Sequence, residues 1–278
     1  MKFKILHLLI FIILPVNIIL GWGEEGHMLI ARKAVMLLPE EMADFKQWGY
    51  FIEEHSPDPD KRKREDKTED PKHYIDLDYY KEFRIGEMIY NKEKLSELYS
   101  DSIVNEIGIL PWATVETYKN LVKAFKDKNR DRILIYSSDL AHYVADGHQP
   151  MHTILNYDGQ LSNQKGLHAR YEIHMVNRYL DEIDNSFYPQ VPFYVSDPLN
   201  FVFYYITTAN LVSGLIYDAD EHAFAETGLR ETEDYYRILW FRTKYITVLQ
   251  MNSAANNLAS LIYSAWTDAG KPDCKDLG

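Results

Sequence analysis

The chain has 278 residues, which is enough for one large domain with a sizeable core or for two modest ones. Its composition is that of a globular protein, with 46% apolar and 26% charged residues. The formal net charge of −12 argues against tight, sequence-independent binding of duplex DNA, although bound metal ions can still create a local cationic site.

Residues 1–21 are predicted to be a secretory signal peptide. The segment opens with basic residues, continues as an apolar stretch and ends on a small residue. Interruptions at His7 and Pro15 argue against the alternative, an uncleaved membrane anchor. Cleavage after Gly21 would make Trp22 the first residue of the mature protein and would deliver it to the periplasm or outside the cell.

Six long stretches have apolar residues at helical spacing, and period-two alternation is confined to short pieces. The stretches are residues 24–38, 111–129, 130–148, 167–183, 198–226 and 235–270. We therefore predict one all-α domain over residues 22–270, a bundle of about six or seven helices. Residues 271–278 are predicted to be a tail, in which Cys274, the single cysteine, is a tail thiol. Two long polar loops, 55–78 and 153–166, are expected to be functional.

Two histidine–carboxylate pairs provide the strongest chemical signal. His142 and Asp146 are four residues apart, and so are His168 and Glu172, so each pair shares one face of its predicted helix. His152 follows the first pair, just beyond a proline that disrupts or ends the helix. Two antiparallel helices with such pairs can converge on a metal, and imidazole with carboxylate suits zinc. The alternative for either pair alone is a solvated helix face.

Four segments occur in order between residues 22 and 172: "WGEEGH", "DPD…HYID", "HYVADGHQPMH" and "LHARYE". Together they resemble the three-zinc phosphodiesterase superfamily, whose main branches are the secreted single-strand-specific nucleases and the bacterial zinc-dependent phospholipases C. The resemblance implies an all-α fold whose long polar loops surround a trinuclear metal site. The later helices agree in type but contain no diagnostic motif.

The resemblance implies three Zn²⁺ ions per chain, bound by histidines, carboxylates and the N-terminal residue. The first ion is assigned to Asp60, His73, His142 and Asp146. The second is assigned to the free amine and carbonyl of Trp22, to His27 and again to Asp146. The third is assigned to His152, His168 and Glu172.

Two of these assignments depend on further conditions. The segment "DPD" contains two aspartates, and the resemblance to the phospholipase branch favours Asp60, with Asp58 as the alternative. The amine of Trp22 is free only after the signal peptide has been removed, so an uncleaved precursor should lack one complete metal site.

Residues beside the ligands are implied to act on the substrate. Asp146, shared by two zinc ions, is the central catalytic residue of a mechanism that uses a metal-activated water. Lys63 lies three residues after Asp60, where the nuclease branch tends to carry a basic residue that helps hold the charged transition state. Tyr74 and Asp76 match positions at which the nucleases stack a base and bond its edge, although core packing is the alternative for Tyr74.

The remaining candidates are expected to be structural. His148 should support the turn after the ligand helix or orient a ligand. His174, two residues beyond Glu172, should point to another helix face. Surface positions are expected for two further histidines and two arginines: His55, His222, Arg62 and Arg64.

We predict a secreted or periplasmic zinc-dependent phosphodiesterase, an endonuclease that hydrolyses single-stranded DNA or RNA as a monomer without a protein partner. "HYID" and "HQPMH" favour the nuclease branch, whereas Glu172 and the scarcity of cysteine resemble the phospholipases. A phospholipase C that cleaves phospholipid head groups is therefore the alternative. A non-catalytic secreted helical protein with a structural metal site is the second alternative.

Overall fold

The computed structural model describes residues 22–276, and every regular element in this range is a helix, as predicted. The predicted signal peptide, residues 1–21, lies outside the described residues. Five long helices form the frame: α1 (Gly23–Leu37), α8 (Leu110–Lys126), α9 (Arg130–Gly147), α13 (Pro198–Thr227) and α14 (Glu233–Asp268). Six short helices lie between α1 and α8: α2 (Ala43–Lys46), α3 (Gly49–His55), α4 (Asp58–Arg62), α5 (Lys81–Arg84), α6 (Lys92–Tyr99) and α7 (Asp101–Glu106).

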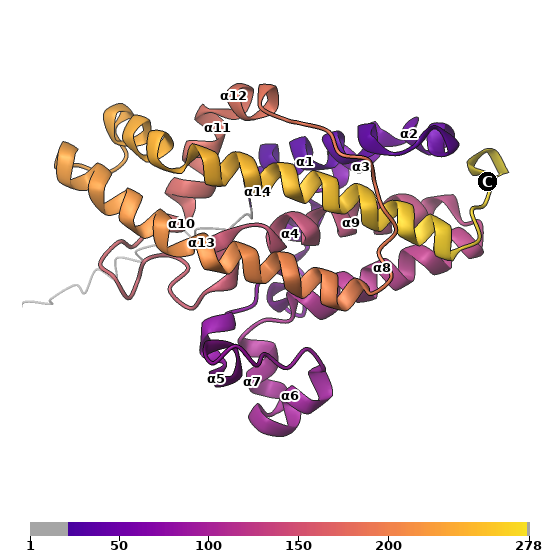
Figure 1. The fold of residues 1–278 in the computed structure, drawn as a ribbon, viewed down its shortest axis with the longest axis horizontal. Coiled ribbons are helices and arrows are strands. Elements are labelled where there is room, and N and C mark those ends of the chain that lie inside the picture. Colours follow the sequence, from indigo (N-terminus) through magenta and orange to yellow (C-terminus); the bar gives the residue numbers. More distant parts are fainter. Residues whose placement is uncertain (1–21, 277–278) are drawn as a thin grey trace, which may run out of the picture.

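The long helices lie side by side in an elongated bundle (Figure 1). α13 and α14 run antiparallel to each other, and α14 also packs against α1, α8 and α9. α14 carries buried residues around much of its circumference in its second half, which is expected for the central helix of a bundle. This arrangement places α9, the helix of the first histidine–carboxylate pair, inside the bundle.

Capping side chains define where three of the long helices begin. Asn129, Asp197 and Thr232 each accept a hydrogen bond from the backbone N–H three residues further on. α9 ends at Gly147, and Pro150 begins a 3-10 turn over Pro150–Thr153. The predicted end of this helix is therefore confirmed, and the turn after it carries His152.

The prediction of one continuous helix over residues 167–183 is wrong. The segment is divided into α10 (Leu167–Ala169), a π-helical turn (Arg170–Met175), α11 (Val176–Arg178) and α12 (Leu180–Asn185). Tyr179 separates α11 from α12, because its backbone angles, φ −114° and ψ 16°, are not those of an α-helix. A π turn is wider than an α turn and is often found at functional sites. Here the π turn carries Glu172.

A small lobe formed by α5, α6 and α7 projects from the bundle (Figure 1) and was not predicted from the sequence. Its apolar core includes Leu77, Tyr80, Leu95 and Val104, and it packs against Phe203 of α13 in the same cluster. Helices of four to eight residues have too few turns to show a clear apolar period, which explains why the pattern missed them.

Residues 186–197 run along α14 without helical structure (Figure 1). Four of their backbone N–H groups bond to side chains of α14: those of Asn252, Asn256, Ser260 and Ser264. These side chains are spaced by four residues, so they form one polar row on the helix. The row provides hydrogen bonds for a segment that has no neighbouring strand.

α13 is long and apolar enough to cross a membrane by length and composition alone. In the bundle, however, Val202, Ile206 and Ile216 of α13 are buried in the two apolar cores.

The interpretation of Cys274 as a tail thiol is wrong, because this residue is only 4% exposed and packs against the core. Burial raises the pKa of its thiol to about 11.

Candidate metal centre

Three groups of buried histidines and carboxylates meet inside the bundle. Within each group, one ligand atom of every residue lies within 4.8 Å of the others. The groups are His27, Asp60 and His142; His73, His142 and Asp146; and His152, His168 and Glu172. Because His142 belongs to two groups, the first two are contiguous. The structure therefore brings together all the side chains that the sequence analysis assigned to zinc, with Trp22 considered separately below.

Asp146 lies at the centre of these groups. Its Oδ2 is 3.0 Å from His73 Nδ1 and 3.1 Å from His142 Nε2. Its Oδ1 is 3.4 Å from His27 Nε2 and 3.5 Å from His152 Nδ1. Although burial alone would raise it, the imidazoles of His142 and His152 hold the pKa of Asp146 well below its usual range. The position of Asp146 between imidazoles of different groups suits a carboxylate that is shared by two cations.

Hydrogen bonds to backbone carbonyls fix which nitrogen each histidine presents. His142 Nδ1 donates to the carbonyl of Ser56 at 2.9 Å, and His152 Nδ1 donates to that of His73 at 2.8 Å. Both rings therefore keep Nε2 available as a ligand atom. The ring of His73 has the opposite orientation to those of His142 and His152. Its Nδ1 faces the centre, and its Nε2 lies 3.6 Å from Glu69 Oε1.

Asp60 reaches the centre from α4. Its Oδ1 is 3.4 Å from His73 Nδ1 and 3.6 Å from His142 Nε2, and it forms an ion pair with Lys63. Asp58, the alternative aspartate, instead has its Oδ2 2.7 Å from His55 Nδ1. Asp60 is 1% exposed, so it is the aspartate of "DPD" that lies beside the histidines.

The third group joins the 3-10 turn after α9 to the π-helical turn. Glu172 Oε2 is 2.7 Å from His168 Nε2 and 3.3 Å from His152 Nε2. Despite these short distances, none of the three atoms has a hydrogen bond of acceptable geometry among the described residues. The side chains are arranged as ligand atoms that converge on a common point.

Trp22 is held beside the centre by its indole. The side chain is fully buried, and its Nε1 donates to the carbonyl of Ala145 at 2.8 Å. His27, on the first turns of α1, stacks on His142 with 4.0 Å between the ring centroids. The predicted ligand role of the Trp22 amine depends on cleavage after Gly21, which lies outside the described residues.

The donor set fits a bound cation. Buried atoms without a hydrogen-bond partner among the described residues include both ring nitrogens of His27 and His168, Nε2 of His152, Oδ1 of Asp60 and Asp146, and both carboxylate oxygens of Glu172. Buried polar groups are costly unless they are hydrogen-bonded or coordinate a metal. Imidazole nitrogens and carboxylate oxygens are the ligands that zinc accepts in proteins. The concentration of such atoms in one place therefore indicates metal binding.

The protonation of two histidines is consistent with this conclusion. Burial, assisted by His142, lowers the pKa of His27 to about 3, so this ring stays in the neutral form that binds metal. Burial also opposes a charge on His152, but Asp146 and Glu172 outweigh it and raise the pKa of His152 to about 9. A metal ion at this place would replace that proton.

The residues predicted to contact substrate lie next to the third group. The backbone N–H of Ile75 donates to the carbonyl of His152, which fixes Tyr74 and Asp76 beside this ligand. The hydroxyl of Tyr74 donates to the carbonyl of Glu106 at 3.0 Å. Burial, together with the neighbouring Asp78, raises the pKa of Asp76 to about 7. The structure thus places an aromatic ring and a partly buried carboxyl together.

Two histidines that were expected to be structural, His148 and His174, have the predicted surroundings. His148 Nδ1 donates to the carbonyl of Val144 at 2.7 Å, and Asn257 donates to His148 Nε2 at 3.0 Å. Both nitrogens of His148 are therefore engaged in supporting the end of α9, as predicted. His174 is exposed, which agrees with a position on another helix face.

Two residues between positions 55 and 78 keep the expected surface position but have partners that the sequence did not indicate. Arg62, with 39% of its side chain exposed, pairs with Asp139 at 2.9 Å and with Glu69 at 3.4 Å. His55, also 39% exposed, lies against Asp58 three residues further on. The pair of Arg62 and Asp139 connects α4 to α9, so it forms only when these two helices pack together.

Two residues around the site were not predicted from the sequence. Glu69 is 3% exposed and accepts hydrogen bonds from Tyr143 and Lys72 while facing His73. It precedes His73 by four residues, and this spacing could have indicated it. Tyr157 packs edge-on against His168, with 5.7 Å between the ring centroids. Its position in a long polar loop gave no comparable signal.

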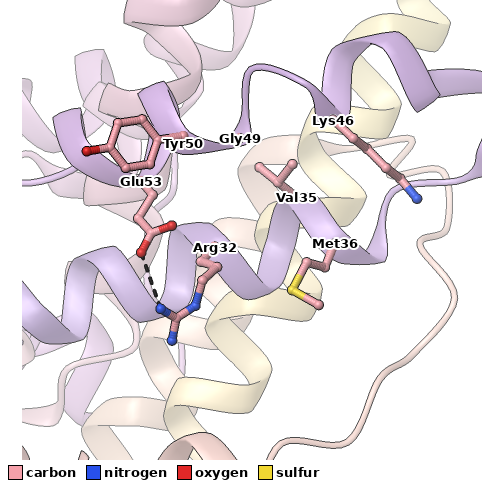
Figure 2. Close-up of a pocket in the computed structure, with 7 residues that line it drawn as sticks. All are labelled: Arg32, Val35, Met36, Lys46, Gly49, Tyr50 and Glu53. Carbon is pink, nitrogen blue, oxygen red and sulfur yellow. Dashed lines mark hydrogen bonds and ion pairs between the residues drawn. The ribbon is translucent and has the colours of Figure 1, made fainter.

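A separate surface pocket of about 230 Å³ lies between α1 and α3 (Figure 2). It is lined by Arg32, Val35, Met36, Lys46, Gly49, Tyr50 and Glu53. Arg32 is paired with Glu53 at 3.3 Å and with Asp184 at 2.9 Å, so its charge is already compensated. None of the lining residues belongs to the three groups of candidate ligands.

The model of the S1/P1 nuclease family matches residues 22–176, which is more than half of the chain and includes every candidate ligand. A comparison with curated proteins finds no match. α13 and α14 lie beyond the matched region.

Proposed function

Because the chain belongs to the S1/P1 nuclease family and is thus a hydrolase of phosphodiester bonds, we propose that it is an exported zinc-dependent endonuclease for single-stranded DNA or RNA. Members of this family are generally secreted, which agrees with the signal peptide predicted for residues 1–21. The single observation that carries the proposal is the convergence of eight buried histidine and carboxylate side chains, seven of which have an atom without a hydrogen-bond partner among the described residues.

Three zinc ions are proposed, one for each set of ligands. The first would be held by Asp60, His73, His142 and Asp146. The second would be held by the amine and carbonyl of Trp22, by His27 and by Asp146. The third would be held by His152, His168 and Glu172. The group of His73, His142 and Asp146 supports the first of these sets, and the group of His152, His168 and Glu172 supports the third. The remaining group, His27, Asp60 and His142, joins proposed ligands of the first two ions, which share Asp146 in this assignment.

Charge explains how an acidic protein can bind a phosphodiester. When bound, zinc polarises phosphate oxygens and lowers the pKa of water so that it can act as the nucleophile. Asp60, Asp146 and Glu172 bring three negative charges to the site, half the charge of three divalent cations. The ammonium of Lys63, paired with Asp60 and 13% exposed, adds a positive charge at the edge of the site.

The same residues hold the reacting groups in place. Backbone hydrogen bonds of His142 and His152 orient their rings, so little rearrangement is needed when substrate binds. Glu69 faces the outer nitrogen of His73 and would keep its Nδ1 directed at the centre. We assign no side chain as a covalent nucleophile.

Single-stranded substrate is proposed because of Tyr74 and Asp76. An unpaired base can stack on an aromatic ring, and this contributes about 1–3 kcal/mol per base. The raised pKa of Asp76, about 7, means that this carboxyl can be protonated near neutrality and can then donate as well as accept at a base edge. Tyr157, which packs against His168, adds a second aromatic side chain next to the third ligand set.

A phospholipase C activity on phospholipid head groups is the alternative. It is favoured by Glu172, where the nuclease branch more often has aspartate, and by the single cysteine of the chain. Both activities break a phosphodiester bond, so the metal ligands alone do not distinguish them. The proposed base-binding role of Tyr74 and Asp76 favours the nuclease, because a phospholipid head group has no base to stack.

Hydrolysis rates on single-stranded DNA and on phosphatidylcholine micelles test the proposal. We expect the mature, zinc-loaded protein to cleave the DNA, and rapid head-group release with intact DNA would overturn the nuclease assignment. Asp60→Asn should lower the rate by about 100-fold or more, because losing a ligand exceeds the 10- to 100-fold effect of its outer partners. Asp58→Asn, on the same short helix, is the matched control and should retain activity.

A further inference from the structure

A buried polar network lies on the outer side of the third ligand set, centred on Asp220 of α13. Asp220 is fully buried and accepts hydrogen bonds from four side chains: Gln164 at 2.9 Å, Arg170 at 2.8 and 3.1 Å, Arg230 at 3.2 Å, and Tyr235. These donors come from the loop before α10, from the π-helical turn, from the connection after α13 and from α14. One carboxylate therefore joins four separate segments.

Arg170 connects this network to the metal centre. It is the first residue of the π-helical turn and is 2% exposed. Besides Asp220, its guanidinium binds the carbonyls of Lys165 at 2.8 Å and Gln164 at 2.9 Å. A planar guanidinium with several fixed donors holds its partners in one geometry better than a flexible ammonium would. Arg170 thus fastens the end of the loop to the start of the helix.

The backbone next to this contact passes close to the guanidinium of Arg170. Gly166, directly before α10, has φ +87°, and a Cβ built on it would lie 2.8 Å from Nη1 of Arg170. The guanidinium therefore occupies the place that a side chain at position 166 would need. A side chain at position 166 would therefore displace either Arg170 or the backbone immediately before His168.

His168 and Glu172 lie two residues before and two residues after Arg170. Residues two apart on a helix point to nearly opposite sides. Arg170 accordingly faces α13 and α14, while His168 and Glu172 face His152. Anchoring Arg170 from behind therefore determines where both ligands are held.

We propose that Asp220 is a positioning residue for the third metal ion, which through Arg170 holds His168 and Glu172 in the geometry for binding. The inference rests on the ligand assignment of the proposed function and extends it to α13, beyond the region matched by the family model. Asp220 does not contact the metal ligands itself. Its effect is on the affinity of one metal site, and the cluster around Asp146 is built without it.

Zinc titration of the metal-depleted mature protein tests this role. We expect Asp220→Asn to weaken the binding of one zinc ion by about tenfold, the lower range for residues that orient ligands, and to leave the other two ions unaffected. Glu221→Gln is the matched control, since Glu221 is the next residue of α13, also contacts Arg230 and is 64% exposed. Zinc affinity in Asp220→Asn equal to that of the unchanged protein would overturn the proposal.

A double-mutant cycle separates positioning from a general loss of stability. In a Glu172→Gln background, the third site is already impaired, so Asp220→Asn should cause little further loss of zinc affinity. Equal, additive losses in both backgrounds would contradict the role. Tyr235→Phe, which removes one hydroxyl from the network and no charge, gives the same test if Asp220→Asn does not fold. Zinc affinity is measured without substrate, so the role of Asp220 can be tested even if the protein binds zinc but cleaves no nucleic acid.

Discussion

The indole Nε1 of Trp22 donates a hydrogen bond to the carbonyl oxygen of Ala145, with 2.8 Å between the two atoms. Ala145 directly precedes Asp146, the carboxylate at the middle of the ligand groups. The backbone of Trp22 is therefore fixed beside α9 by its own side chain. This contact supplies a physical reason for a tryptophan where the mature protein is predicted to begin.

The Trp22 amine can be tested by changing where the protein starts. A protein that begins at Gly21 has an amide in place of the free amine of Trp22, so it should bind one zinc ion fewer than a protein that begins at Trp22. We expect most of the nuclease activity to be lost with it. Metal analysis of the two purified proteins checks this, and equal zinc content would show that the amine is not a ligand.

Stacking by Tyr74 predicts a change in KM for short single-stranded oligonucleotides. Tyr74→Ala should raise KM by about 5- to 150-fold, which corresponds to the loss of about 1–3 kcal/mol of base stacking. Tyr74→Phe keeps the ring and loses only the hydrogen bond to Glu106, so its KM should stay close to that of the unchanged protein. If Tyr74→Ala binds the oligonucleotide normally, the ring is part of the packing and not of the substrate site.

A substitution at Gly108 is expected to displace Tyr74 by a second route. It has φ +99°, and a Cβ at this position would lie 2.1 Å from the carbonyl oxygen of Tyr74. Gly108→Ala should therefore cost about 1–3 kcal/mol of stability through backbone strain and should also raise KM. Gly86→Ala is the control, because Gly86 also has positive φ, +80°, but has no atom within 4 Å of its added Cβ. Urea unfolding and KM together separate strain from displacement of Tyr74, and equal KM values in both variants would contradict the account.

His148 predicts a pH dependence of stability. Burial lowers its pKa in the folded protein to about 4, from 6.5 in the unfolded chain. The unfolded state therefore binds a proton first as the pH falls, so the stabilisation is complete above pH 6.5 and is lost between about pH 6.5 and 4. The loss is on the order of 3 kcal/mol. His148→Gln, which does not titrate, should show a smaller decrease over this range when metal-depleted proteins are compared by urea unfolding. Parallel curves for the two proteins would show that His148 does not carry this dependence.

The sequence predicts those parts of the fold that repeat a pattern over several turns. α8, α9, α13 and α14 were expected close to their observed bounds because their apolar residues recur at helical spacing. α5, α6 and α7 are too short for such a pattern, and their stability depends on packing against α13. The π turn begins at Arg170, whose partner Asp220 lies 50 residues away in the chain, and a local pattern contains no such contact.

The same distinction applies to the residues of the site: local spacing identified some of them, and the others needed the family resemblance or the structure. His142 with Asp146 and His168 with Glu172 were found by their spacing of four residues, although only the first pair lies on a single α-helix, since Glu172 belongs to the π turn after α10. The resemblance was needed for Trp22, His27 and His73, which are far from these pairs in sequence. Asp220 and Arg62 could be identified only from the structure, since their partners lie up to 77 residues away in the chain.

Reconstitution with zinc tests the central claim most directly. The rate of cleavage of a single-stranded oligonucleotide is measured on the mature protein after chelation and then as Zn²⁺ is added back. We predict that cleavage disappears on chelation and returns as the sites are filled. Cleavage that persists in the metal-free protein, or a zinc-loaded protein that leaves the oligonucleotide intact, would contradict the account.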